Sequence, residues 1–134
     1  MNIEDIEGVG PQLADKLRAA GVATVAALLE RGASPKGRRD LADQTGIAGS
    51  QILRWVNHAD LYRIKGVGSE FSDLLELAGV DTVAELARRN AANLAENFQS
   101  VAAERPNVVR RVPSQAVIEG WIAQAKELPR VVDY

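Results

Sequence analysis

The stretch Ile64-Lys65-Gly66-Val67-Gly68 decides the fold, because its pattern occurs once before in the chain, as Ile6-Glu7-Gly8-Val9-Gly10. Two glycines around one small apolar residue permit a backbone turn that residues with a Cβ would obstruct. An apolar-periodic segment begins directly after each copy and ends at a Gly-Val pair, Gly21-Val22 or Gly79-Val80. Each copy therefore predicts a tight turn that leads at once into a helix.

The two copies belong to a longer internal duplication. A shift of 58 positions aligns them without a gap and also superimposes the two Gly-Val pairs. So many matches at one offset indicate two repeats. We predict a single compact domain over 1–134, with a first repeat over 1–60, a second over 61–128 and an extended tail over 129–134.

Local signals place the helices of each repeat. The expected N-terminal caps are Asn2, Thr24, Ser34, Asp60, Ser69, Thr82 and Asn90. The predicted helices cover about 3–6, 11–20, 35–45 and 50–59 in the first repeat and 61–64, 69–78, 91–103 and 114–128 in the second, with a short helix after each of Thr24 and Thr82. No period-two strand is present, so the chain is expected to be all-α.

The final helix of each repeat carries a tryptophan. Trp55 and Trp121 match at an offset of 66, so the second repeat has gained 8 residues. We place the gained residues in the loop around Glu104 to Asn107. The two tryptophans are expected in equivalent packing positions.

Composition narrows the function classes. Of 134 residues, 46% are apolar and 4% aromatic, so aliphatic side chains must fill the core. The absence of cysteine excludes disulfides and thiolate metal sites. No stretch is apolar enough to span a bilayer and the N-terminus lacks signal-peptide features, so a cytoplasmic location without a membrane partner is expected. The net charge of −2 means that a nucleic-acid face would need local clustering of cations.

The pattern Ile-x-Gly-Val-Gly, between a short helix and a longer one that ends in Gly-Val, resembles the helix-hairpin-helix motif over 3–29 and 61–87. The whole chain resembles an uncharacterised bacterial and archaeal family of tandem helix-hairpin-helix proteins. The resemblance implies two such motifs packed with pseudo-twofold symmetry, and here each would be extended by two further helices. It also implies hairpins whose backbone N–H groups hold phosphates of duplex DNA without reading bases.

The leading hypothesis is sequence-independent, non-enzymatic nucleic-acid binding through these turns. The expected binding residues are Arg63, Lys65, Gly66, Val67, Gly68 and Ser69 at the second turn, Gly8, Val9 and Gly10 at the first, and Arg88 and Arg89 beyond the second. The chain departs from the motif two residues after the second glycine, where a cation is usual and Gln12 and Glu70 stand. Glu4, Asp5 and Glu7 also surround the first turn, so the second turn is expected to contribute more.

A second route to nucleic acid lies in three basic clusters, which are Lys36-Arg38-Arg39, Arg88-Arg89 and Arg110-Arg111 with Arg105. Glu and Asp are interspersed nearby, so ordinary solvated charge is the favoured interpretation of each pair taken alone. Residues 38–57 also resemble a helix-turn-helix, with Ser50, Gln51, Arg54 and Asn57 outward from a recognition helix. The repeat already explains the same helices as packing elements.

Catalysis is not expected. His58 is the only histidine, and no nucleophile set, metal-ligand cluster or phosphate-binding loop of the P-loop type is present. We therefore predict no cofactor, no metal and no small-molecule substrate. The alternative function is a protein–protein adaptor in which the glycine turns are purely structural.

Overall fold

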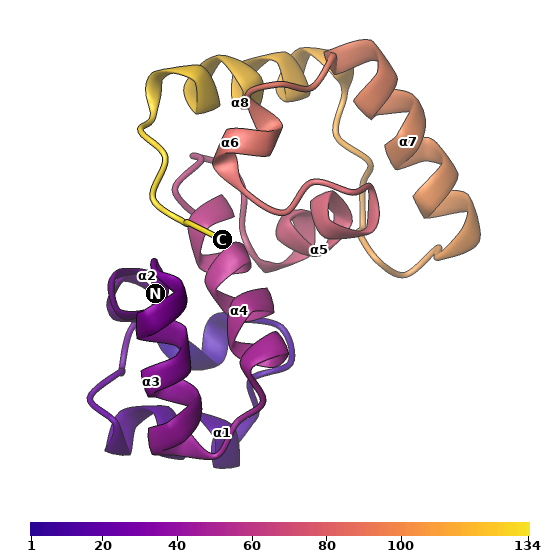
Figure 1. Ribbon diagram of the computed structural model, residues 1–134. Helices are drawn as coiled ribbons and strands as arrows, with labels where there is room; N and C mark the ends of the chain where they lie inside the picture. Colours follow the sequence, from indigo (N-terminus) through magenta and orange to yellow (C-terminus); the bar gives the residue numbers. More distant parts are fainter. The chain divides into compact units, whose positions relative to one another are not determined.

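The computed structural model describes all 134 residues and is helical, without a β-strand, so the prediction of an all-α chain is confirmed. Figure 1 shows the helices in chain order. They are the 3₁₀ helix η1 (Ile3–Asp5), α1 (Pro11–Ala19), α2 (Val25–Gly32), α3 (Pro35–Thr45), α4 (Gly49–Leu61), α5 (Ser69–Leu77), α6 (Val83–Leu86), α7 (Ala91–Glu104) and α8 (Gln115–Glu127).

The chain divides into two compact units. Unit 1 comprises Met1–Asp60 together with Val131–Tyr134, and unit 2 comprises Leu61–Arg130. Unit 1 therefore contains the last four residues of the chain as well as the first sixty. No helix in either unit has the length and apolarity needed to cross a membrane.

Side-chain caps begin most of the helices, as their sequence predicts. The hydroxyls of Thr24, Ser34 and Thr82 and the amide oxygen of Asn90 each accept an N–H bond from the residue three positions on. Such a bond satisfies one of the donors that a helix leaves unpaired at its start. The caps fix where α2, α3, α6 and α7 start.

Two expected caps are wrong. Asp60 lies inside α4, which continues to Leu61 because Ala59 and Leu61 are buried and extend the apolar face of that helix. A separate helix over 61–64 is therefore absent, and a turn closed by the Ile64 N–H and the Leu61 carbonyl replaces it. Ser69 is the first residue of α5, and Gly68 occupies the cap position.

The core of unit 1 forms around Trp55, which is fully buried on α4. Leu17 of α1, Leu28 of α2 and Leu41 of α3 are fully buried as well. Helices α2 and α3 are in contact with each other and are joined by the short connection 33–34. The aliphatic composition thus closes the core around one large aromatic ring.

The tail adds a last element to unit 1. Val132 is buried, and the N–H of Asp133 donates to the Ala33 carbonyl at 2.8 Å. The hydroxyl of Tyr134 donates to Asn57 Oδ1 at 3.2 Å. Asn57 is only 8% exposed, so the expectation that it faces outward from a recognition helix is wrong.

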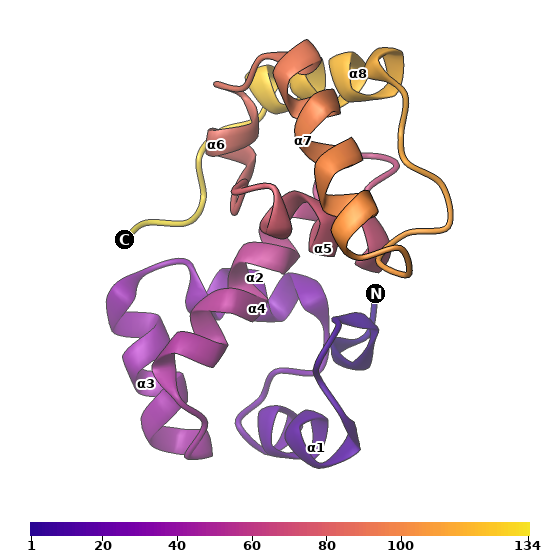
Figure 2. The ribbon, with the colours of Figure 1, turned by 90° about the vertical axis from the view of Figure 1, so that its right-hand side faces the viewer.

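The core of unit 2 forms around Trp121 of α8. Its ring lies 5.2 Å from that of Phe71 on α5 and 6.4 Å from that of Phe98 on α7, measured between centroids. Helices α7 and α8 pack against each other (Figure 2). The segment 105–114 connects them and has ten residues, whereas the corresponding connection 46–48 in unit 1 has three, so seven of the eight gained residues lie in the loop region that the sequence indicates.

Candidate nucleic-acid interface

The two Gly-Val-Gly turns share one backbone geometry. Gly8 has a φ of +91° and Gly66 a φ of +95°, in the region that residues with a Cβ rarely adopt. Val9 and Val67, between the glycines, are each 5% exposed and point into the core of their unit. A buried valine anchors each turn, and the flanking glycines are left at the surface.

A tryptophan lies under the first glycine of each turn. A Cβ on Gly8 would lie 3.7 Å from Nε1 of Trp55, and one on Gly66 would lie 3.3 Å from Nε1 of Trp121. Both indoles are buried, as expected for equivalent packing positions. The last helix of each unit, α4 or α8, therefore packs its tryptophan under the Gly-Val-Gly turn near the start of the same unit.

Backbone donors at each turn have no acceptor within the protein. The first N–H bonds inside α1 and α5 are those of Ala14 to Gly10 and of Ser72 to Gly68, both 2.9 Å long. The N–H groups without a protein acceptor are those of Gly8, Gly10, Gln12 and Leu13 at the first turn and of Gly66, Gly68, Ser69, Glu70 and Phe71 at the second. A helix N-terminus with such donors attracts anions.

Two predicted donors are not available. The N–H of Val9 donates to the Ile6 carbonyl and that of Val67 to the Ile64 carbonyl, both at 3.1 Å. These bonds close the turns from inside, so the expectation that the valine amides hold phosphate is wrong. The valines contribute by packing alone.

The second turn is held by a side chain that the sequence did not single out. Gln124 of α8 accepts the N–H of Lys65 at 2.8 Å and returns a bond to the Lys65 carbonyl at 3.2 Å. The side-chain amide of Gln124 therefore forms both hydrogen bonds to the Lys65 backbone that a neighbouring β-strand would form. This pair fixes the chain just before Gly66 and leaves the Lys65 side chain exposed.

The cations near the second turn differ in availability. The Lys65 ammonium is exposed, whereas Nη2 of Arg63 donates to the Pro129 carbonyl at 2.7 Å. An open hollow of about 300 Å³ adjoins both side chains and is also lined by Gln124, Glu127 and Leu128. A similar hollow of about 550 Å³ lies at the first turn, over Gly8, Gly10, Pro11, Gln12 and Leu13.

The predicted residues Arg88 and Arg89 do not line that hollow. Arg88 is exposed, and Nη1 of Arg89 donates to the Ala78 carbonyl at the end of α5, at 3.3 Å. In unit 1, Nη1 of Arg31 donates in the same way to the Ala20 carbonyl, at 3.0 Å. Both arginines satisfy a carbonyl at a helix C-terminus, where a cation is favourable. Arg31 and Arg89 lie 58 positions apart, which is the repeat offset, so the sequence marks them as equivalent residues of the two repeats.

Arg38 is also structural rather than a surface cation. It is 7% exposed and donates to the carbonyls of Gly32, Ala33 and Asp133 at 2.8, 3.1 and 2.6 Å. Burial lowers its pKa, because a charged group loses solvation in the interior. The cluster Lys36-Arg38-Arg39 therefore does not act as one basic surface, and Lys36 pairs with Asp40 at 3.1 Å.

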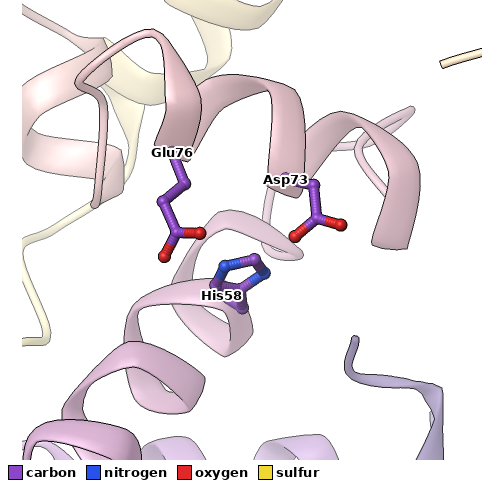
Figure 3. A group of neighbouring side chains, drawn as sticks. All are labelled: His58, Asp73 and Glu76. Atoms are coloured by element: carbon purple, nitrogen blue, oxygen red, sulfur yellow. The ribbon is translucent and has the colours of Figure 1, made fainter. Parts of the chain in front are cut away.

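Acidic groups around the turns are largely engaged. Glu4 accepts a hydrogen bond from Arg18, and Asp5 Oδ2 accepts the Asn2 N–H at 2.8 Å. At the second turn, Oε1 of Glu70 accepts the Arg110 N–H at 2.6 Å. Asp73 and Glu76 follow on α5 and project from the same side of that helix (Figure 3). The Glu4–Arg18 pair offsets a negative charge at the first turn, whereas Glu70 keeps its charge while it accepts the Arg110 N–H.

The Glu4–Arg18 pair predicts a pH-dependent contribution to stability. The hydrogen bond from Arg18 lowers the pKa of Glu4, since it stabilises the charged carboxylate. Such a group stabilises the fold at pH values above its unfolded pKa, and the contribution disappears as the pH falls through the lower folded pKa. An NMR titration should show the Glu4 pKa rising toward its ordinary value in Arg18→Gln. An unchanged Glu4 pKa in that variant would show that the pair does not exist in solution.

His58 lies in the last turn of α4 and is 1% exposed (Figure 3), so the helix-surface position typical of a lone histidine does not describe it. Neither unit gathers three histidine or carboxylate ligands from its own residues into a metal site. The arrangement that each unit does offer is a set of unpaired backbone donors at a helix start.

Comparison with known proteins gives one match. Residues 7–128 match the model of a protein family described as "Domain of unknown function (DUF4332)". No curated protein and no solved structure matches the chain. The match covers both Gly-Val-Gly turns and all helices from α1 to α8.

Proposed function

Because the chain belongs to the family described as "Domain of unknown function (DUF4332)", we propose its function from its own residues. The protein binds the sugar–phosphate backbone of duplex DNA without catalysis and without sequence preference. In this proposal each Gly-Val-Gly turn and the helix that follows it act as the hairpin and second helix of a helix-hairpin-helix motif, although a turn replaces the helix expected over 61–64. The pseudo-twofold pairing of the two motifs stays a prediction.

One observation carries the proposal. The amides of Gly66, Gly68 and Ser69 have no acceptor in the protein, and the exposed ammonium of Lys65 lies next to them in the chain. Phosphate oxygens accept bonds from backbone N–H groups at helix N-termini and from lysine. Donors of this kind position a backbone but distinguish no bases, since base edges lie in the grooves.

The second turn supplies more of the binding than the first. Pro11 is the first residue of α1 and has no N–H, whereas Ser69 at the matching position of α5 has one. The first turn is preceded by Glu7 where the second has Lys65. The second turn therefore has one additional amide donor and one additional cation.

This difference provides the test. Ser69→Pro removes a single N–H, and the helix tolerates proline at its first position. Gly68 already has an extended backbone, with φ −111° and ψ −158°, which suits a residue before proline. Loss of one bond to a charged phosphate, about 1.4 kcal/mol, should raise the Kd for duplex DNA about tenfold. The measurement is fluorescence anisotropy of a labelled duplex at low salt.

Controls separate the backbone donor from other effects. Ser69→Ala keeps the N–H and should bind like the wild type. Lys65→Glu should weaken binding to every duplex alike and flatten the salt dependence by about 0.9 for the lost phosphate contact. Wild-type binding that is absent at low salt, or insensitive to salt, would refute the proposal. A protein partner that persists in pull-downs after nuclease digestion would then favour the adaptor function.

A further inference from the structure

The segment 105–114 gives unit 2 exposed arginines that have no counterpart in the corresponding connection of unit 1. It contains Arg105, Arg110 and Arg111, all three exposed. None of them forms an ion pair with a carboxylate. The segment has ten residues, against three in the corresponding connection 46–48.

The segment is fixed at one defined place. The Arg110 N–H donates to Oε1 of Glu70 at 2.6 Å, while Val109 is 7% exposed and Pro113 is buried. Glu70 is the second residue of α5, and its own N–H is one of the unpaired donors of the second turn. The bond therefore brings Arg110 and Arg111 to the start of α5, beside those donors.

We propose that Arg110 and Arg111 form a second phosphate-binding site, which holds the backbone phosphates next to the one bound at the second turn. This inference rests on the proposed function. The arginine guanidinium has a planar arrangement of donors that matches a phosphate, and the neighbouring backbone N–H groups donate to the same kind of ligand. Unit 2 is then the main contact with DNA, and it contacts several consecutive phosphates.

Glu70 acts as a positioning residue for this site. Its carboxylate holds the Arg110 amide, and its negative charge lowers the affinity for the phosphate bound nearby. Glu70→Gln removes the charge and keeps an oxygen that can accept the Arg110 N–H. Glu70→Ala removes both the charge and the acceptor, so a comparison of the two variants isolates the effect of the bond.

The experiment measures the Kd of the full chain for a labelled duplex over a series of salt concentrations. Arg110→Gln with Arg111→Gln should weaken binding and reduce the slope of log K against log salt by about 1.8, or about 0.9 for each phosphate lost. The control is Lys16→Gln with Lys126→Gln, which removes the same charge from two exposed lysines. Glu70→Gln should bind more tightly than the wild type, and Glu70→Ala less tightly than Glu70→Gln.

The outcomes distinguish this inference from the proposed function. An unchanged slope in the double arginine variant, while Ser69→Pro still weakens binding, would overturn the inference alone. An equal loss in the lysine control would overturn it as well, because net charge would then explain the effect. Absence of wild-type binding would overturn both proposals.

Discussion

Gly37→Ala is expected to destabilise unit 1 by about 3 kcal/mol or more, the upper range for inserting atoms into a packed site. A Cβ at position 37 would lie 2.0 Å from the Arg31 carbonyl oxygen and 3.2 Å from its carbon. Those atoms are backbone, so a rotamer change cannot relieve the collision. The start of α3 would have to move away from the end of α2. Urea denaturation followed by circular dichroism measures the loss.

Gly120→Ala is the matched control for this prediction. Gly120 lies in α8, and a Cβ there would meet nothing within 4 Å. Alanine has the higher helix propensity, so this exchange should raise stability by up to about 1 kcal/mol. A Gly37→Ala protein as stable as the wild type would mean that α2 and α3 do not approach so closely.

Arg38→Met is the second change with a large expected effect, a loss of about 3 kcal/mol in the free energy of unfolding. Methionine fills much of the same volume but removes the donor of the Gly32 and Asp133 carbonyls, while the Ala33 carbonyl keeps only the Asp133 N–H. A buried acceptor that loses its partner costs more than an exposed one, because no water replaces the bond. The measurement is again urea denaturation.

The neighbouring residue provides the control. Arg39 is exposed, so Arg39→Met should change stability by less than about 0.5 kcal/mol. Hydrogen exchange gives a second measurement, since the Asp133 N–H is bonded to Ala33 and should lose protection in Arg38→Met. Equal stabilities of the two variants, with Asp133 still protected, would show that Arg38 does not hold the tail.

Local features of the fold could be predicted from sequence because their causes are local. The caps at Thr24 and Thr82 act over three residues, and Gly21 and Gly79 adopt positive φ where the sequence ends a helix. Local causes also determine the glycine turns, the helices that follow them and the position of the gained residues. Each depends on residues close together in the chain.

Features that join distant residues could not be predicted in the same way. Gln124 pairs with Lys65 across 59 positions, and Arg38 reaches Asp133 across 95. A surface glutamine or arginine has the same local pattern whether or not such a partner exists. The sequence pattern around Arg38 therefore favours a solvated cation. The turns themselves were identified, but which of their amides are already bonded depends on three-dimensional geometry.

The place of Val131–Tyr134 in unit 1 has a consequence for biosynthesis. A ribosome makes the chain from the N-terminus, and domains generally fold in that order as they emerge. Here the first sixty residues leave the exit tunnel early, yet Arg38 and the Ala33 carbonyl receive their partner Asp133 only after seventy intervening residues have been translated. The half of the protein that is synthesised first is thus the half that is completed last.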